Sequence, residues 1–379
     1  MPSSLNDNLR TKKLTKNSYG FFEIVHREKF FALIVLALGL LCLLVYPYPQ
    51  IAMWVGFGLA GYAAIANDSI QTIGTFIASN KHRKWYYLWL FMGLIFLVTV
   101  YYSWTTFDGD VSNQRLTSKG FEQAPTEFTF LQLAAPLILL IITRMRMPVS
   151  TTFLLLNAFS TKTSTIIHIL DKSLSGYFLA FFLALAVWLL VSKFVNKFFK
   201  GKPHQMWVVF QWITSGLLWS VWLQQDAANI AIYLPRSLSM WQFVGFASYI
   251  FLGLGLLFYL KGDKIQGIVD EKSGVTDVRA ATLVDFIYAI LLYYKLFEST
   301  IPMSTTWLFI GLLGGRELAI SLTRNKYKKR KKATVKAFKM IGKDMLYALI
   351  GLIISMILAL AINDEIRREI MGMLKDFFA

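Results

Sequence analysis

Two short stretches of the sequence place acidic and amide side chains inside apolar segments. The stretches are AAIANDSIQTIGTFIASN (63–80) and LQQDAANIAIY (223–233). Their polar residues of interest are Asn67, Asp68 and Gln71 in the first and Gln225, Asp226 and Asn229 in the second. Carboxylate, amide and hydroxyl oxygens are the ligands that hard cations such as Na⁺ prefer. Since each Asp precedes a Gln or Asn by three residues, a helix would place each pair on one face. The pattern predicts cation binding in both stretches.

Two further stretches carry hydroxyl side chains shortly after a proline. They are MPVSTTFLLLNAF (147–159) and IPMSTTWLFIGLL (301–313). Proline tolerates the first turn of a helix and Ser or Thr can cap it, so each stretch predicts the N-terminus of a half-helix. The free N–H groups and the positive dipole end would then face an anion. The residues expected to bind an oxyanion are Ser150, Thr151, Thr152, Ser304, Thr305 and Thr306.

The composition predicts the elements that must position these residues. The chain is 56% hydrophobic and 16% charged, whereas a soluble domain has roughly 25% charged residues. Runs such as FFALIVLALGLLCLLVY (30–46) carry no charge, and a helix crosses a bilayer with roughly 17–25 such residues. Continuous runs exclude the alternating pattern of a membrane barrel. The sequence therefore predicts an all-α polytopic membrane protein.

The distribution of basic residues predicts the orientation of the spans. Spans are expected near 30–46, 51–79, 85–103, 128–143, 148–169, 175–192, 206–234, 241–260, 281–297, 302–322 and 340–362. Basic clusters occur in the N-terminal segment 1–29, in KHRK (81–84), RMR (144–146) and KYKKRKK (326–332), and at the lysines of 193–202. With eleven spans and a cytoplasmic N-terminus, all five clusters lie in the cytoplasm, as the positive-inside rule requires. The loop 104–127 is then outside. The compact loops favour a bacterial inner (plasma) membrane.

The same rule accounts for the formal net charge of +17. No basic segment interleaved with aromatic residues is present to hold a nucleic acid, so no nucleic-acid partner is expected. The single cysteine, Cys42, excludes an intramolecular disulfide and a cysteine-based metal site. The sequence contains no H-E-x-x-H, G-x-S-x-G or P-loop motif. We therefore expect neither an enzyme nor a nucleotide-driven pump.

The two kinds of motif recur in the same order in both halves of the chain. The distance from Asp68 to Ser150 is nearly the same as that from Asp226 to Ser304. Each half, 51–192 and 206–362, is expected to contain five spans, so the second half would be inserted upside down. The sequence thus predicts an inverted-topology repeat with broken or half helices, plus an extra N-terminal span at 30–46. The tail 363–379 predicts an amphipathic helix on the outer interface.

Taken together, ANDSIQTIGT, PVSTT, QQDAAN and PMSTT resemble the inorganic phosphate transporter (PiT) family. The resemblance covers about 51–362 and is dense only at these four motifs. Gln71 and Gln225 replace Asn residues of the family pattern, and the Gly-Pro of the second motif is absent. Phe153 and Trp307 stand where the family has His.

The resemblance implies a secondary active transporter that imports inorganic phosphate by sodium symport through alternating access. Sodium would bind at the Asp-containing motifs, and the anion at the two Ser-Thr-Thr motifs. One alternative is a proton-coupled transporter of sulfate or another tetrahedral oxyanion. Another is a membrane sensor that binds an anion without moving it. The partners implied are the anion, the coupling ion and membrane lipid, and the oligomeric state, a homodimer included, is left open.

Several other polar residues within the spans leave their roles open. Arg316 and Glu317 could neutralise each other or help to bind the anion. Asp285 and Lys295 predict snorkelling or interhelical pairs. Lys162 is ambiguous, and His168 is expected to lie near the membrane interface.

Overall fold

The computed structural model describes residues 28–378, except 119, 146, 148, 199–200, 202, 261–277 and 324–326. The side chains of 69–71, 192–198, 327–329, 373–374 and 376–378 are also left out of the description. The long helices are α2 (Lys29–Val45), α3 (Pro49–Ala66), α4 (Asp68–Ser79), α5 (Trp85–Thr106), α6 (Phe130–Arg144), α8 (Thr163–Phe198), α9 (Met206–Ala231), α10 (Met240–Tyr259), α12 (Val278–Glu298), α13 (Thr305–Leu322), α14 (Tyr327–Ile362) and α15 (Asp364–Phe378). Short helical turns are η1 (Arg115–Thr117), η2 (Thr152–Leu156) and α7 (Asn157–Phe159).

The described part of the chain is entirely helical, and its helices have the length and composition of membrane spans. Seven of them are long and apolar enough to cross a bilayer: α3, α5, α8, α9, α10, α12 and α14. Large apolar side chains such as Leu36, Val98 and Leu190 point outward, with 62%, 69% and 79% of their surface exposed. Such faces suit a hydrocarbon solvent. The prediction of an all-α polytopic membrane protein is confirmed.

The segment predicted as one span at 51–79 is broken in its middle. The α-helix ends at Ala66, Asn67 adopts φ −112° and ψ −68°, and α4 begins at Asp68. The backbone N–H of Asn67 still donates to the carbonyl of Ala63, so the break is a local change of direction rather than a loop. A broken helix of this kind exposes backbone groups only where protein or a cavity can satisfy them.

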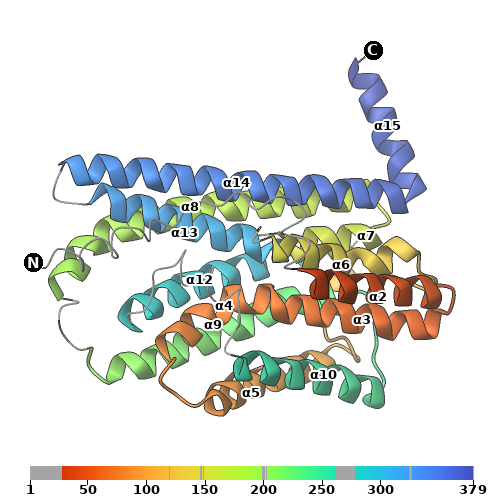
Figure 1. The fold of residues 1–379 in the computed structure, drawn as a ribbon, viewed down its shortest axis with the longest axis horizontal. Helices are drawn as coiled ribbons and strands as arrows, with labels where there is room; N and C mark the ends of the chain where they lie inside the picture. Colours follow the sequence, from red (N-terminus) through yellow and green to blue (C-terminus); the bar gives the residue numbers. More distant parts are fainter. Residues whose placement is uncertain are drawn as a thin grey trace, which may run out of the picture.

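Two helical hairpins enter the bundle from opposite ends (Figure 1). The first consists of α6 followed by η2 and α7, and the second of α12 followed by α13. Their turns meet in the interior, where the Thr152 hydroxyl donates to the Met303 carbonyl at 3.1 Å. The segments predicted as separate spans at 128–143, 148–169, 281–297 and 302–322 are thus arranged as two hairpins whose turns contact each other, and of their helices α12 is long and apolar enough to cross a bilayer. Of the RMR cluster (144–146), predicted in the cytoplasm, Arg144 is the last residue of α6 and pairs with Glu28, while Arg146 lies outside the described residues.

The boundary predicted between spans at 169–175 does not exist. The chain bends at 160–162, where the Ser160 hydroxyl donates to the Lys162 carbonyl, and α8 then runs unbroken from Thr163 to Phe198. The polar run DKSLS suggested a loop, but Lys172 and Ser173 are buried inside α8 and have partners on the second hairpin. A polar residue is tolerated in a buried helix when another element satisfies it.

The helices of the two halves pack against one another in a reciprocal pattern. The long helix α8 of the first half packs along α13 of the second, and α14 of the second packs against η2 and α7 of the first. Similarly, α5 contacts α9 while α10 contacts α3, and α5 and α10 contact each other. Figure 1 shows that α3 and α9 begin at opposite ends of the bundle. An inverted repeat predicts this pattern, and the repeat itself stays a prediction.

The close packing of α8 against α13 depends on two glycines four residues apart. A Cβ at Gly311 would lie 2.4 Å from the Tyr177 carbonyl oxygen, and one at Gly315 would lie 2.1 Å from the Phe181 carbonyl oxygen. Both neighbours are backbone atoms of α8, which cannot swing away. Small residues at i and i+4 are the usual device by which membrane helices approach closely. The glycines thus fix the second hairpin on α8.

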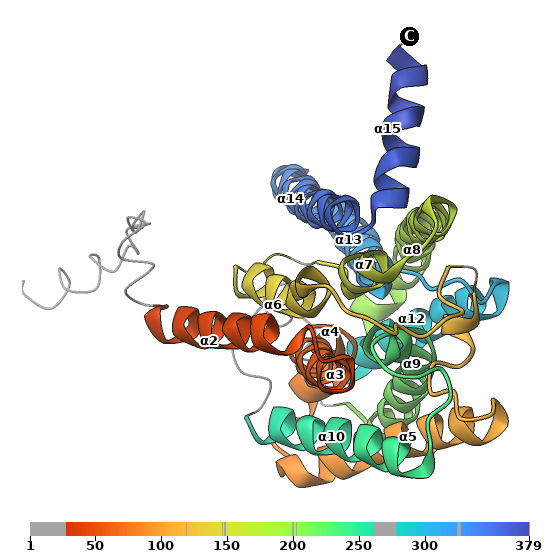
Figure 2. The same ribbon diagram turned by 90° about the vertical axis from the view of Figure 1, so that its right-hand side faces the viewer.

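Two helices extend away from this bundle. Figure 2 shows α2 and α15 leaning outward from the remaining helices. Only Cys42 and Val45 of α2 are buried, and the Cys42 thiol contacts the Leu133 carbonyl of α6. Helix α15 follows α14 after a turn at Asn363, whose side-chain oxygen accepts from the N–H groups of Glu365 and Ile366. The predicted interfacial position of α15 stays a prediction.

Candidate functional site

The break between α3 and α4 places Asp68 at the start of a helix. The Asn67 amide donates to the Asp68 carboxylate at 2.8 Å and to the Val149 carbonyl of the first hairpin at 3.4 Å. Only 2% of Asp68 is exposed. A helix N-terminus favours a negative charge because its N–H groups and dipole are positive. The local fold therefore offsets part of the cost of burying this carboxylate.

The second predicted carboxylate, Asp226, lies on the unbroken helix α9. It accepts hydrogen bonds from the Thr305 hydroxyl at 2.6 Å and from the Asn229 amide at 2.6 Å. The Asn229 amide also donates to the Thr152 hydroxyl at 3.2 Å. One carboxylate thus connects α9 with the turns of both hairpins. The i to i+3 pairing of Asp226 with Asn229, predicted from the sequence, is present.

The two carboxylates lie within electrostatic range of each other. Asp68 and Asp226 are each 2% exposed, and the side chain of Thr151 lies beside Asp68. The hydrogen bonds given above come from amides and a hydroxyl, and within the described residues no salt bridge to Lys or Arg neutralises either acid. Two buried like charges repel, and a cation between them would relieve both repulsion and desolvation.

Several buried polar atoms near these carboxylates have no hydrogen-bond partner among the described residues. They are both side-chain polar atoms of Gln225, Oδ1 of Asn229 and the hydroxyl of Thr151. Buried polar atoms are normally satisfied, so such a group of exceptions calls for a ligand. Amide and hydroxyl oxygens suit a hard cation. Gln71 lies in α4, but its side chain is outside the described residues.

The Ser-Thr-Thr motifs begin helices, as predicted. The Ser150 hydroxyl accepts from the N–H of Phe153 at 3.1 Å, and the Ser304 hydroxyl accepts from the N–H of Trp307 at 3.2 Å. Both serines therefore cap the helical segment that follows them. Their hydroxyls are engaged with their own helices in this conformation.

The four threonines of these motifs are buried and differ in what they contact. Thr152 donates to Met303 and Thr305 to Asp226, whereas the hydroxyl of Thr151 has no partner in the described structure. Thr306 is 3% exposed. The Thr305 hydroxyl donates directly to Asp226, so a Ser-Thr-Thr motif and an Asp-containing motif are in contact. The groups predicted to bind an anion and those predicted to bind a cation therefore lie next to each other.

The residue that follows each Ser-Thr-Thr motif is aromatic, and the two aromatic rings contact each other. Phe153 and Trp307 contact each other with ring centroids 5.2 Å apart and planes at 61°. An edge-on pair of this kind is a favourable aromatic arrangement. The family pattern described above has His at these two positions. Neither the phenyl nor the indole ring can relay a proton as an imidazole does.

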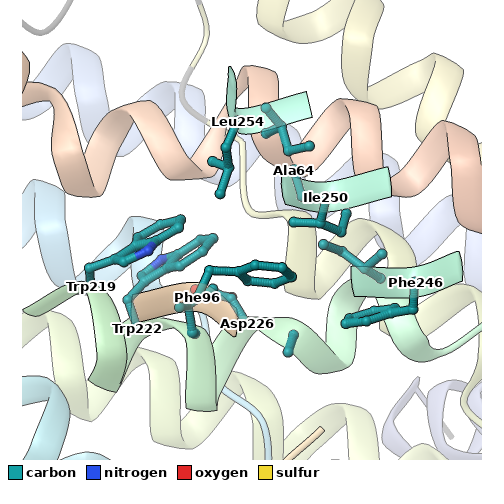
Figure 3. A pocket seen from close by; sticks show the side chains of 12 residues that line it. Ala64, Phe96, Trp219, Trp222, Asp226, Phe246, Ile250 and Leu254 are labelled. Carbon is teal, nitrogen blue, oxygen red and sulfur yellow. The ribbon is translucent and has the colours of Figure 1, made fainter. Parts of the chain in front are cut away.

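A small cavity of about 20 Å³ adjoins Asp226 (Figure 3). Its lining from α3, α5, α9 and α10 is apolar apart from that carboxylate, and includes Ala64, Phe96 and the stacked pair Trp219 and Trp222. A water molecule needs at least about 10–15 Å³ of such volume. The cavity has room for one water molecule, but its lining offers few polar partners besides Asp226, and it is too small for a tetrahedral oxyanion.

A third buried carboxylate is Asp285 of α12, for which the sequence predicted snorkelling or an interhelical pair without naming its partners. Asp285 is 1% exposed and accepts from the hydroxyls of Thr75 at 2.6 Å and Ser215 at 2.5 Å. Thr75 belongs to the same motif as Asp68, and its place in that motif was the one sequence feature that could have indicated a polar partner for Asp285. The expected interhelical contact is present, but snorkelling is not.

The structure also shows the contacts of the other polar residues whose roles the sequence left open. The Arg316 guanidinium pairs with Glu317 at 2.9 Å, so these two charges neutralise each other. Lys295 pairs with Glu298 at 2.7 Å rather than with Asp285. Lys162 and His168 are exposed and contact none of the buried carboxylates. No group of three or more His, Cys, Asp or Glu side chains that could hold a metal occurs in the described part of the chain.

Comparisons with known proteins add little to this geometry. No protein-family model and no curated protein matches the chain. One solved structure, described as the sodium-dependent phosphate transporter, is similar with a TM-score of 0.47 and 18% identity, over 82% of this chain and 99% of that structure. We therefore base the function on the side chains of the site.

The unsatisfied amide of Gln225 gives a first testable prediction. If Gln225 is a cation ligand, Gln225→Leu should weaken Na⁺ binding by about tenfold, because one oxygen ligand is lost. The thermal stability of the purified protein should stay equal or rise, since an unpaired buried amide is removed. Na⁺-dependent protection against thermal unfolding measures both effects. A loss of stability with unchanged Na⁺ protection would show that Gln225 is structural.

Proposed function

We propose that the protein is a secondary active transporter that moves inorganic phosphate across a membrane together with a cation, Na⁺ in the first instance. The observation that supports this most is the convergence of Asp68 and Asp226, one from each half of the chain, on the two Ser-Thr-Thr turns. An oxyanion needs hydrogen-bond donors, whereas a hard cation needs oxygen ligands. This site supplies donors and oxygen ligands within hydrogen-bonding distance of each other.

The cation would bind among the carboxylates and the unsatisfied amide oxygens. The proposed ligands are Asn67, Asp68, Gln71, Gln225, Asp226 and Asn229. A bound cation would neutralise part of the buried negative charge, which otherwise repels an anion. Cation and anion would then favour each other's binding, and this mutual dependence is what couples their transport.

The anion would bind at the starts of η2 and α13. A helix N-terminus leaves N–H groups without intrahelical partners, and the serine caps satisfy only some of them. Ser150, Thr151, Thr152, Ser304, Thr305 and Thr306 would supply the remaining donors. In the present conformation Thr305 donates to Asp226, so anion binding would compete for this hydroxyl.

Alternating access is the mechanism that the arrangement supports. The two hairpins enter from opposite ends and meet at the site (Figure 1). Movement of one hairpin would open the site to one side and movement of the other to the opposite side, as in transporters built from inverted repeats. The chain carries no nucleotide motif, so an ion gradient would supply the energy. We place the protein in a bacterial plasma membrane with its N-terminus in the cytoplasm.

Uptake into proteoliposomes tests this proposal. Purified protein is reconstituted, and accumulation of labelled phosphate is measured with an inward Na⁺ gradient and, separately, with a proton gradient alone. We expect accumulation with Na⁺ that an Na⁺ ionophore abolishes. Accumulation with protons alone would make Asp68 and Asp226 proton carriers, and competition by unlabelled sulfate would identify a wider oxyanion substrate. Saturable binding without accumulation under either gradient would instead identify an anion sensor.

A further inference from the structure

Three basic side chains are buried around the turn of the second hairpin, outside the site described above. They are Arg115 of η1, Lys172 of α8 and Lys295 of α12, which are 3%, 6% and 3% exposed. Lys172 lies within electrostatic range of both other cations and of Glu298. Burial lowers the pKa of Arg115 to about 10, so this guanidinium remains charged at neutral pH.

These cations hold the hairpin turn through its backbone carbonyls. Arg115 donates to the carbonyl of Leu296 at 2.8 Å and also to that of Ser299. Lys172 donates to the carbonyls of Ser299 at 3.0 Å and Ile301 at 2.7 Å. A helix C-terminus attracts positive charge, which accounts for part of this arrangement.

The carbonyls do not balance the charge of this cluster. Lys295 is paired with Glu298, whose side chain is 43% exposed. Arg115 and Lys172 bond only to carbonyl oxygens in the described contacts, and Nε of Arg115 has no partner there. Buried charges that lack a counter-ion are costly, and like charges close together raise that cost. Among the described contacts Glu298 is the one carboxylate near these three basic groups, so positive charge exceeds negative charge in the cluster.

The cluster also adjoins the start of the anion-binding helix. Ser173, next to Lys172, accepts a hydrogen bond from the backbone N–H of Ser304 at 2.9 Å. The segment 299–303 that Arg115 and Lys172 hold leads directly into Ser304 and Thr305. An anion bound to the cluster would therefore lie beside the segment that leads into the central site.

We propose that Arg115, Lys172 and Lys295 form a second oxyanion-binding site, which inorganic phosphate occupies before it reaches the central site. This rests on the proposed function for the identity of the anion. Guanidinium and ammonium groups bind phosphate through short, charge-assisted hydrogen bonds. The bound phosphate accepts hydrogen bonds from the groups of Arg115 and Lys172 that now donate to the carbonyls of Ser299 and Ile301. Its arrival thus releases the turn of the second hairpin and lets the anion pass.

Equilibrium dialysis of labelled inorganic phosphate against the purified full-length protein, in detergent and excess Na⁺, tests this proposal. We expect the wild type to bind two phosphate ions per chain. Lys172→Gln should remove one of them, or weaken it by about tenfold or more, because a charged donor is lost. Lys172→Arg should retain it, and Lys162→Gln, which removes an exposed lysine just before the same helix, should bind as the wild type does. Thermal unfolding of each variant establishes that it is folded.

The outcomes separate this inference from the proposed function. If Asp226→Asn removes the only phosphate that binds and Lys172→Gln changes nothing, the second site does not exist and the central site stands. If Lys172→Gln removes the only phosphate, the second site stands and the central site is wrong. If Lys172→Gln fails to fold, Arg115→Gln serves in its place, since that side chain comes from a loop. If the wild type binds no phosphate, both proposals fail.

Discussion

Asp226→Asn is expected to lower cation-driven phosphate uptake by on the order of a hundredfold. Removing one member of a buried, hydrogen-bonded charged group costs about 2–5 kcal/mol, and each 1.4 kcal/mol corresponds to about tenfold. Asn has nearly the same shape as Asp and keeps one oxygen for the Asn229 amide, while its NH2 group can donate to the Thr305 hydroxyl, which accepts as well as donates. The packing around it should therefore survive. What is lost is the negative charge that would hold the cation.

The measurement is the initial rate of labelled phosphate uptake into proteoliposomes with an imposed Na⁺ gradient. The matched control is Asp108→Asn, the same substitution at an exposed loop position with φ 49°. Asn tolerates this left-handed conformation as well as Asp does. Asp68→Asn should behave like Asp226→Asn. Uptake at the wild-type rate in both variants would show that the cation does not bind at these carboxylates.

Gly315→Ala is expected to destabilise the protein more than any other single methyl addition discussed here. The new Cβ would lie 2.1 Å from the Phe181 carbonyl oxygen, so α13 and α8 must move apart along their length. Overpacking of a tight contact typically costs 1–3 kcal/mol, and a backbone neighbour leaves no side chain to rotate away. We expect a fall in the apparent melting temperature of about 5 °C or more.

Gly342→Ala is the matched control for this substitution. It adds the same methyl group to a helix, α14, at a position with no heavy atom within 4 Å. Alanine is the better helix former, so this variant should be as stable as the wild type or more stable by about 0.5–1 kcal/mol. Thermal unfolding in detergent followed by gel filtration compares the two. Equal melting temperatures would mean that α8 and α13 do not pack as closely as described.

The apolar runs and helix starts could be predicted from the sequence because their causes are local. Hydropathy alone indicates a membrane helix, and the serine caps at Ser150 and Ser304 follow from residue types within one turn. The polar run at Lys172 was misinterpreted as a loop for the opposite reason. Its partners, the carbonyls of Ser299 and Ile301, lie far away in the sequence. No local pattern reveals that a lysine has such partners.

The same limit explains what was missed at the site. The repeated motifs indicated that Asp68 and Asp226 correspond, but not that Thr305 donates directly to Asp226. Nor could the sequence show that Asp285 bonds to Thr75 and Ser215 from two other helices. The sequence also did not reveal that α6 with η2 and α7, and α12 with α13, form hairpins whose turns meet, because hydropathy gives the length of an apolar segment and not the partner that its end contacts.

The contact between α8 and α13 has a consequence for how the molecule is assembled. Each half of the chain provides a long helix against which the other half's hairpin packs, so neither half contains the complete surface that its own hairpin needs. A first half synthesised alone would present α8 with its partner face bare, and that face includes the buried Lys172. Folding must therefore remain incomplete until the second hairpin has been inserted. If the protein transports as proposed, we expect the moving parts to differ from the two sequence halves, because the long helix of each half packs against the hairpin of the other.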